Sequence, residues 1–171
     1  TGDNISGADI IASGAISGVS ALTLSDVGGT ATFSNSVSTT DLTIGNTVAN
    51  VTFSNNLTST NAVSFANDGA LTFSNDGATR SFNGGITTTS VGGTVTLSGT
   101  LQTSNDVITL GSVSLVGNTT IDTNATSTTG DITIAAVTGG SNNLTLSTGD
   151  NIGGADITAS GAISGVVQLE L

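Results

Sequence analysis

The sequence contains no cysteine, histidine, lysine, methionine, tryptophan, tyrosine or proline, and Arg80 is its one basic residue. Without cysteine the chain cannot form disulfides. It also lacks the side chains that most often serve as general bases, nucleophiles or substrate clamps. The remaining candidates are carboxylates, which lie mostly in turn dipeptides such as Asp68-Gly69 and Asp76-Gly77. We therefore predict that the protein is not an enzyme and that it has no catalytic residues, no cofactor and no metal site.

Basic charge is nearly absent. Twelve acidic residues against one arginine give a formal net charge of −11 at pH 7. Sequence-independent binding to nucleic acid requires rows of lysine and arginine, and an anionic membrane surface repels a protein of this charge. Long apolar runs are also missing, since none approaches the roughly 18 residues of a membrane-spanning helix. These absences exclude nucleic acid as a partner and argue against membrane insertion.

A long internal repeat spans the chain. Residues 1–19 and 148–166 are identical at seventeen of nineteen positions, at an offset of 147 residues. The two differences are Ser6 against Gly153 and Ile11 against Thr158. The sequence starts with threonine and shows no secretory signal, so we interpret residues 1–171 as one segment of a longer protein. The repeat predicts an array with a 147-residue unit, of which slightly more than one copy is present.

A shorter repeat determines the fold. Gly, Ser, Thr, Asn and Asp separate short apolar triplets, and hydrophobic residues make up 36% of the chain, which is too much for a disordered segment. The main series is Ala31-Thr32-Phe33, Val51-Thr52-Phe53, Leu71-Thr72-Phe73, Val95-Thr96-Leu97, the weaker Thr119-Thr120-Ile121, and Leu144-Thr145-Leu146. A second series is Leu42-Thr43-Ile44, Val63-Ser64-Phe65, Ile108-Thr109-Leu110 and Ile132-Thr133-Ile134. A third, looser series is Ser36-Val37-Ser38, Asn56-Leu57-Thr58, Gly85-Ile86-Thr87 and Thr100-Leu101-Gln102.

Strict alternation of apolar and polar residues is typical of strands, because neighbouring side chains point to opposite faces. Triplets are too short to be stable alone, but they become stable when copies stack in register about 4.8 Å apart. We therefore predict one all-β domain, a right-handed parallel β-helix of about seven coils of 20–25 residues, roughly 30–35 Å long. The rival is an antiparallel sandwich, whose strands are usually longer and joined by tight hairpins.

In-register stacking would place like residues above like. Phe33, Phe53 and Phe73 are expected to form an internal aromatic stack, with Phe65 and Phe82 in another corner. A ladder of Asn35, Asn55 and Asn75 is expected to bridge coils or to stabilise turns. Arg80 stands where an inward apolar residue is expected. A register shift or a bulge would turn its side chain outward, and the sequence does not decide between these arrangements.

The outer surface offers two candidate kinds of binding site. Thr1-Gly2-Asp3-Asn4 and its copy Thr148-Gly149-Asp150-Asn151 carry single acids in glycine-rich turns, which make weak calcium sites. The central threonines of the main series, if stacked in one column, would form an outward hydroxyl surface. This column is Thr32, Thr52, Thr72, Thr96, Thr120 and Thr145. Because the flanking positions are apolar and face inward, the column would be one residue wide, which makes ice or carbohydrate binding the alternative and not the preferred function.

The segments GGTATFSN, GGTVTLSG, NLTLSTGDNI and ADITASGAISGV resemble very large bacterial β-strand-repeat surface proteins, including filamentous-haemagglutinin-like and autotransporter passenger adhesins. The resemblance covers the whole chain and implies export to the cell surface, a rod-like stalk, and adhesion by other segments. Leu169-Glu170-Leu171 still has a strand pattern, with no polar cap. The expected partners are therefore copies of the same repeat, joined or stacked end to end. No receptor, glycan or other ligand is indicated.

Overall fold

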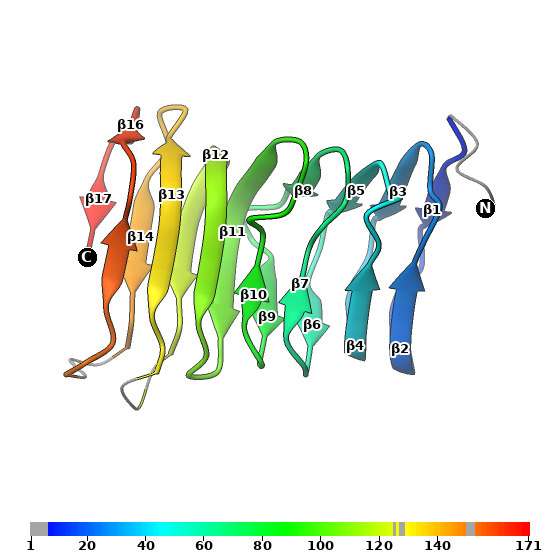
Figure 1. Ribbon diagram of the computed structural model, residues 1–171, viewed down its shortest axis with the longest axis horizontal. Coiled ribbons are helices and arrows are strands. Elements are labelled where there is room, and N and C mark those ends of the chain that lie inside the picture. The colour runs from blue at the N-terminus through cyan, green and yellow to red at the C-terminus, as the bar shows by residue number, and fades with distance from the viewer. Residues whose placement is uncertain (1–6, 125, 127–128, 150–152) are drawn as a thin grey trace.

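The protein is a right-handed parallel β-solenoid of about seven coils, with β1 (Ile10–Ala12) and β17 (Leu169–Glu170) at opposite ends of the molecule (Figure 1). The computed structural model describes residues 7–124, 126, 129–149 and 153–171. Every strand pairing within these residues is parallel, and none of them is helical. The predicted fold class is confirmed. The antiparallel sandwich is wrong, because each strand pairs with strands one coil away and not with a hairpin neighbour.

The strands stack in three columns, which we call A, B and C in the order in which the chain passes through them. Column A contains β1 (Ile10–Ala12), β3 (Thr30–Phe33), β5 (Asn50–Phe53), β8 (Leu71–Phe73), the start of β11 (Val95–Thr103), the middle of β12 (Ile108–Asp122), the end of β13 (Ile132–Thr138) and β16 (Ile163–Ser164). Column B contains the start of β2 (Ile16–Leu24), the start of β4 (Val37–Ile44), β6 (Leu57–Ser59), β9 (Thr79–Phe82), the ends of β11 and β12, β14 (Leu144–Ser147) and β17 (Leu169–Glu170). Column C contains the ends of β2 and β4, β7 (Val63–Ser64), β10 (Ile86–Thr87), the starts of β12 and β13, and β15 (Ile157–Ala159).

The register explains why such short strands are stable. In column A, Ala31 pairs with Val51 and Val51 with Leu71, and all three are buried. The threonine in the middle of each triplet faces outward and is partly exposed. Each coil therefore adds apolar side chains to one continuous core and satisfies the backbone groups of the coil before it.

The five phenylalanines form a single cluster in this core. Phe33 and Phe53 stack with ring centroids 4.9 Å apart, and Phe53 and Phe73 stack at 5.9 Å. Phe65 meets Phe73 and Phe82 edge-on, at 5.9 Å in both cases. The predicted stack is confirmed, and Phe65 and Phe82 pack against it from columns C and B.

Spacing alone assigned some triplets to the wrong column. Thr119–Ile121 and Leu144–Leu146 pair with each other and belong to column B, whereas the column A partner of Val95–Leu97 is Val113–Leu115. Ile86 lies in column C, whereas the other members of the looser third series lie in column B. The reason is that coil lengths vary: Val95 and Val113 are eighteen residues apart, but Thr120 and Thr145 are twenty-five.

The asparagine ladder stabilises turns more than it links coils. Asn35 Oδ1 and Asn55 Oδ1 accept hydrogen bonds from the backbone N–H of the next residue, at 2.8 Å in both cases. Asn75 Nδ2 does bridge coils, since it donates to Ser54 O at 3.2 Å. Other side chains at the starts of strands link coils more directly. Asp9 Oδ1 accepts from Thr30 N at 2.7 Å, and Asn50 Oδ1 accepts from Ala70 N at 2.9 Å.

Candidate functional surfaces

The outward hydroxyl groups form two columns on separate faces. The hydroxyl column on the outside of strand column A consists of Thr32, Thr52, Thr72, Thr96, Ser114, Thr138 and Ser164. The column on strand column C is Thr23, Thr43, Ser64, Thr87, Thr109, Thr133 and Thr158. The single column predicted from the sequence is wrong beyond its fourth member, because Thr120 and Thr145 lie on column B. The column C surface was not predicted, although Thr43, Ser64, Thr109 and Thr133 are the central residues of the second triplet series.

Each hydroxyl column is a chemically simple surface. The threonines lie between inward apolar neighbours, so each column is one residue wide on its strand. Not every hydroxyl of the columns is accessible: Thr96 Oγ1 is buried without a hydrogen-bond partner. Next to the column on strand column A, Ser74 Oγ donates to Ser54 Oγ at 3.2 Å. The columns offer uncharged hydrogen-bonding groups to water or to a sugar, and no group that titrates near neutral pH.

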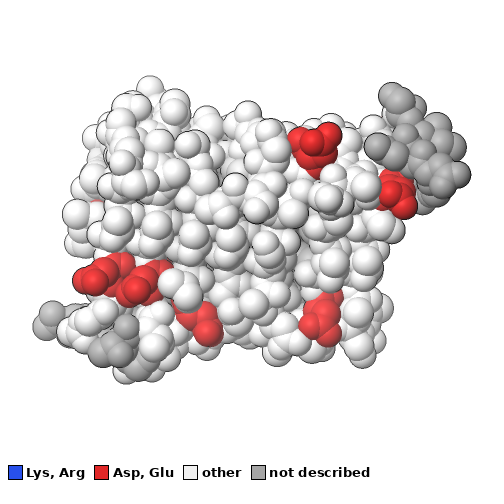
Figure 2. Space-filling model, viewed as in Figure 1, with Lys and Arg blue, Asp and Glu red and all other residues white. Residues whose placement is uncertain are grey.

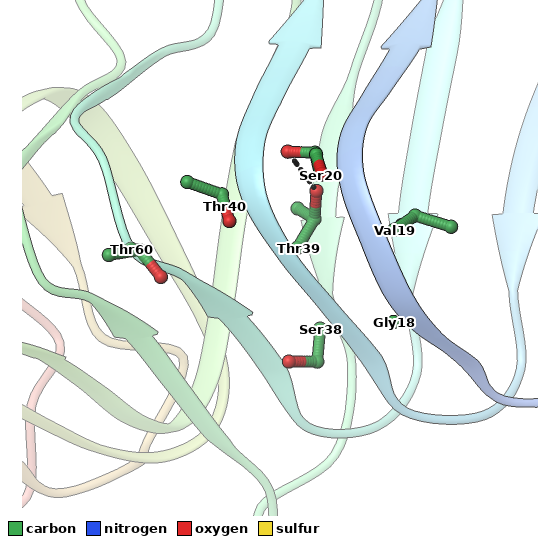
Figure 3. A pocket seen from close by; sticks show the side chains of 7 residues that line it. All are labelled: Gly18, Val19, Ser20, Ser38, Thr39, Thr40 and Thr60. Atoms are coloured by element: carbon green, nitrogen blue, oxygen red, sulfur yellow. Dashed lines mark hydrogen bonds between the residues drawn. The ribbon is translucent and has the colours of Figure 1, made fainter.

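A shallow pocket of about 290 Å³ lies where β2 and β4 bend from column B to column C (Figure 3). It is lined by Gly18, Val19, Ser20, Ser38, Thr39, Thr40 and Thr60. The hydroxyl of Thr39 is already hydrogen-bonded, since it lies 2.9 Å from Asp41 O and 3.3 Å from Ser20 O. The lining contains no charged side chain. Its chemistry therefore does not differ from that of the hydroxyl columns.

Acidic side chains lie toward the edges of the face shown in Figure 2, and no basic side chain is visible on it. Some of the carboxylates accept hydrogen bonds from an adjacent coil: Asp131 Oδ1 accepts from Asp156 N at 2.9 Å. Within the described residues, no three acidic side chains gather closely enough to hold a metal ion. Thr1-Gly2-Asp3-Asn4 and Asp150-Asn151, weighed above as calcium sites, lie outside those residues.

Arg80 faces inward and is 1% exposed. It occupies the column B position of Leu57 and Leu101. Its Nη1 donates to Ser98 O at 2.5 Å and to Asn75 O at 3.0 Å. The guanidinium also lies 5.6 Å from the centre of the Phe73 ring. The expectation that a register shift or a bulge turns Arg80 outward is therefore wrong: Arg80 keeps the inward register of Leu57 and Leu101, and its side chain is directed into the core.

Burial lowers the pKa of Arg80 to about 10, and the nearby Asp76 carboxylate partly offsets that effect. The side chain thus remains a cation at neutral pH. Gly99 makes room for it, since a Cβ at that position would lie 2.9 Å from Arg80 Nη1. Arg80 is a structural donor to backbone carbonyls, and it supplies no positive charge for a ligand on the outer surface.

Buried hydroxyls at the end of column B are a further feature that the sequence analysis missed. Thr39, Ser59, Thr103 and Thr123 face inward. Each hydroxyl lies 2.6–3.0 Å from a carbonyl of the turn that leads to column C. In the sequence they are indistinguishable from outward threonines, except that each follows an inward apolar residue by two positions. Their role is to satisfy turn carbonyls and not to bind a ligand.

The described residues contain no helix that is long and apolar enough to cross a membrane. Comparisons with known proteins give no match: no family model, no curated protein and no solved structure is significantly similar to the chain.

Proposed function

We propose that the protein is a structural rod: a segment of a secreted bacterial surface protein that acts as an adhesin stalk or as a subunit of an extracellular filament. The observation that carries the proposal is the continuity of the core. The inward apolar positions of columns A and C are occupied in coil after coil, and parallel pairing joins each coil to the next. A chain built in this way is extended and resists bending, because every coil is held by both of its neighbours.

The surface supports a spacer function. It presents hydroxyls and scattered carboxylates, and its one cation is buried. The pocket between β2 and β4 is lined by small and hydroxyl side chains, none of which is charged. A high density of small polar side chains and a net charge of −11 keep such a rod soluble and prevent its faces from associating with each other.

The proposal of an extracellular location rests on composition and on the resemblance to surface repeat proteins. A chain with one basic residue offers almost no site to trypsin-like proteases, which suits a protein exposed outside the cell. Two of the segments that carry the resemblance contribute strands to the solenoid: GGTATFSN contains β3, and GGTVTLSG contains the start of β11.

The test compares a spacer with the alternative, a module that binds carbohydrate or ice. The full chain is applied to a glycan array and to an ice-growth assay, with the double variants Thr52→Val plus Thr72→Val and Thr109→Val plus Thr133→Val, one for each hydroxyl column. A spacer gives no saturable binding and no change in ice growth, and the variants behave like the parent. Saturable binding that either double variant abolishes would replace the spacer by the alternative function.

A further inference from the structure

The repeated sequence occurs at both ends of the solenoid. One copy is followed by a coil that packs against it, and the other copy is preceded by one. The first copy, which includes β1 and β2, pairs with β3 and β4 of the coil that follows it. The second copy, which includes β15, β16 and β17, pairs with β13 and β14 of the coils that precede it. The same repeated sequence thus pairs with the following coil at one end of the molecule and with the preceding coil at the other.

The inward positions of the two copies agree. At the offset of 147 residues, Ile10, Ile16 and Leu22 correspond to Ile157, Ile163 and Leu169. In the first copy they pair with Ala31, Val37 and Leu42 of the following coil. In the second copy they pair with Ile132, Val137 and Leu144 of the preceding coil. The same face of the repeated segment therefore points into the core in both places, so the two sets of partners can cover it together.

The two copies occupy different columns. Ile10 lies in column A but Ile157 lies in column C, and Leu22 lies in column C but Leu169 lies in column B. From β1 to β15 the chain completes six whole coils and two-thirds of a seventh. One 147-residue step therefore turns the sequence by a third of a coil relative to its previous copy.

The open end at β15–β17 presents groups that the first copy uses to bind the next coil. Ile157 is 36% exposed and Leu169 is 42% exposed, although both occupy inward positions. In the first copy, Ala8 O accepts from Gly29 N at 3.0 Å and Ala12 O accepts from Ser34 N at 2.9 Å. The corresponding carbonyls belong to Ala155, two residues before β15, and to Ala159, the last residue of β15, and β15 pairs only with β13 among the described strands.

Two side chains of the second copy fit the same arrangement. Asp9 Oδ1 accepts a hydrogen bond from Thr30 N of the following coil. Its counterpart Asp156 already donates its own N–H to Asp131 Oδ1 of the preceding coil. Thr158 replaces Ile11, whose side chain is 75% exposed at the outward position of β1. A threonine at this position extends the hydroxyl column of Thr109 and Thr133.

We propose that the open end at β15–β17 is the docking surface for a second copy of this repeat, which continues the solenoid directly after Leu171 with the counterpart of Ser25. The counterpart of β3 then covers β15, and the counterpart of β4 covers β16 and β17. Column C of one copy continues as column A of the next, and successive copies are rotated by a third of a turn. This inference rests on the proposed rod function and specifies how rods of this sequence are joined.

The test uses the full chain extended at its C-terminus by a second copy of residues 25–171. Because the chain has no cysteine, a pair of introduced cysteines reports a single contact. Thr158→Cys is combined with Thr32→Cys in the second copy, where adjacent coils place the two Cα atoms roughly 5 Å apart, within the range for a disulfide. Oxidation is followed by non-reducing gel and by intact mass. We expect near-complete disulfide formation, and a rod longer than the parent by about 32 Å in electron micrographs.

Two cysteine pairs serve as controls. Thr133→Cys with Thr158→Cys joins residues that are in register within the chain itself, so it must form a disulfide if the solenoid is correct. Thr158→Cys with Thr43→Cys in the second copy tests stacking without the third-turn rotation and should remain reduced. If the first control forms but the Thr158–Thr32 pair does not, the docking inference fails and the rod stands. If the first control also fails, the rod itself is wrong.

Discussion

The strongest test of the architecture is the truncation of Phe53 to alanine. Phe53 is 1% exposed and lies between Phe33 and Phe73, with ring centroids 4.9 and 5.9 Å away, and Phe65 packs against it edge-on at 6.4 Å. Phe→Ala substitutions in cores cost about 3–5 kcal/mol, because apolar contact is lost and a cavity remains. The loss of three aromatic contacts places Phe53→Ala near the upper end of that range, at about 4–5 kcal/mol.

The matched control is the neighbouring residue, Thr52. Its side chain points outward and is partly exposed, so Thr52→Ala removes a hydroxyl and a methyl group from the surface and leaves the core unchanged. We expect a cost below about 1 kcal/mol, the span of strand propensities. The contrast between two adjacent residues isolates the direction of the side chain, because strand, coil and backbone hydrogen bonds are shared.

Urea unfolding followed by far-ultraviolet circular dichroism measures both variants, since the chain has no tryptophan or tyrosine to report by fluorescence. The midpoint should fall sharply for Phe53→Ala and hardly at all for Thr52→Ala, while the slope of the transition stays constant. Equal losses in the two variants, or a loss below about 1 kcal/mol for Phe53→Ala, would refute the stacked register.

Asn67 is fully buried and its Nδ2 donates to three backbone carbonyls, so Asn67→Asp should lower the free energy of unfolding in urea by at least about 2 kcal/mol. Asn35→Asp should be nearly neutral, because Asn35 Oδ1 accepts a hydrogen bond from Ser36 N and the aspartate oxygen can do the same. Gly93→Ala should lower the melting temperature by several degrees, because its Cβ would lie 2.6 Å from the backbone of the preceding coil; Gly14→Ala meets open space and should not. The free energy of unfolding should not change with pH between about pH 6 and 9. The pKa of Arg80 is lowered only to about 10, so the folded and unfolded chains both keep its proton in this range, and the chain has no histidine that would titrate there. A slope in that window, measured by urea titration at each pH, would contradict the assignment of Arg80.

The sequence predicted the fold because its signal is local and repeated. An apolar–Thr–apolar triplet specifies a strand and its inward face without reference to the rest of the chain, and the recurrence of phenylalanine at 33, 53 and 73 fixed the register of three coils. The assignment of triplets to columns failed for Gly85–Thr87, Thr119–Ile121 and Leu144–Leu146. Turn lengths decide which column a strand enters, and turns of glycine, asparagine and serine have no pattern comparable to that of the strands.

The arrangement of the surface was harder to predict than the core. Thr39 and Thr103 have buried hydroxyls that bind turn carbonyls, whereas Thr52 and Thr109 have outward ones, and all four are threonines within strands. The inward direction of Arg80 depends on the carbonyl of Ser98, which is eighteen residues away and accepts its hydrogen bond. Such partners are defined by the stacking of particular coils, so they emerge only with the three-dimensional register.

The third-turn rotation between repeats bears on which function the surface can serve. Along one side of an extended rod, column C of one copy would be followed by column A and then by column B of the next two copies. Columns C and A present threonine and serine, but column B presents Gln102 and Asp122 among its outward residues. A long flat hydroxyl face, as an ice-binding surface requires, would therefore be interrupted in every third copy. A spacer does not depend on which side of a repeat faces a given direction, so the rotation favours a stalk over an extended binding surface.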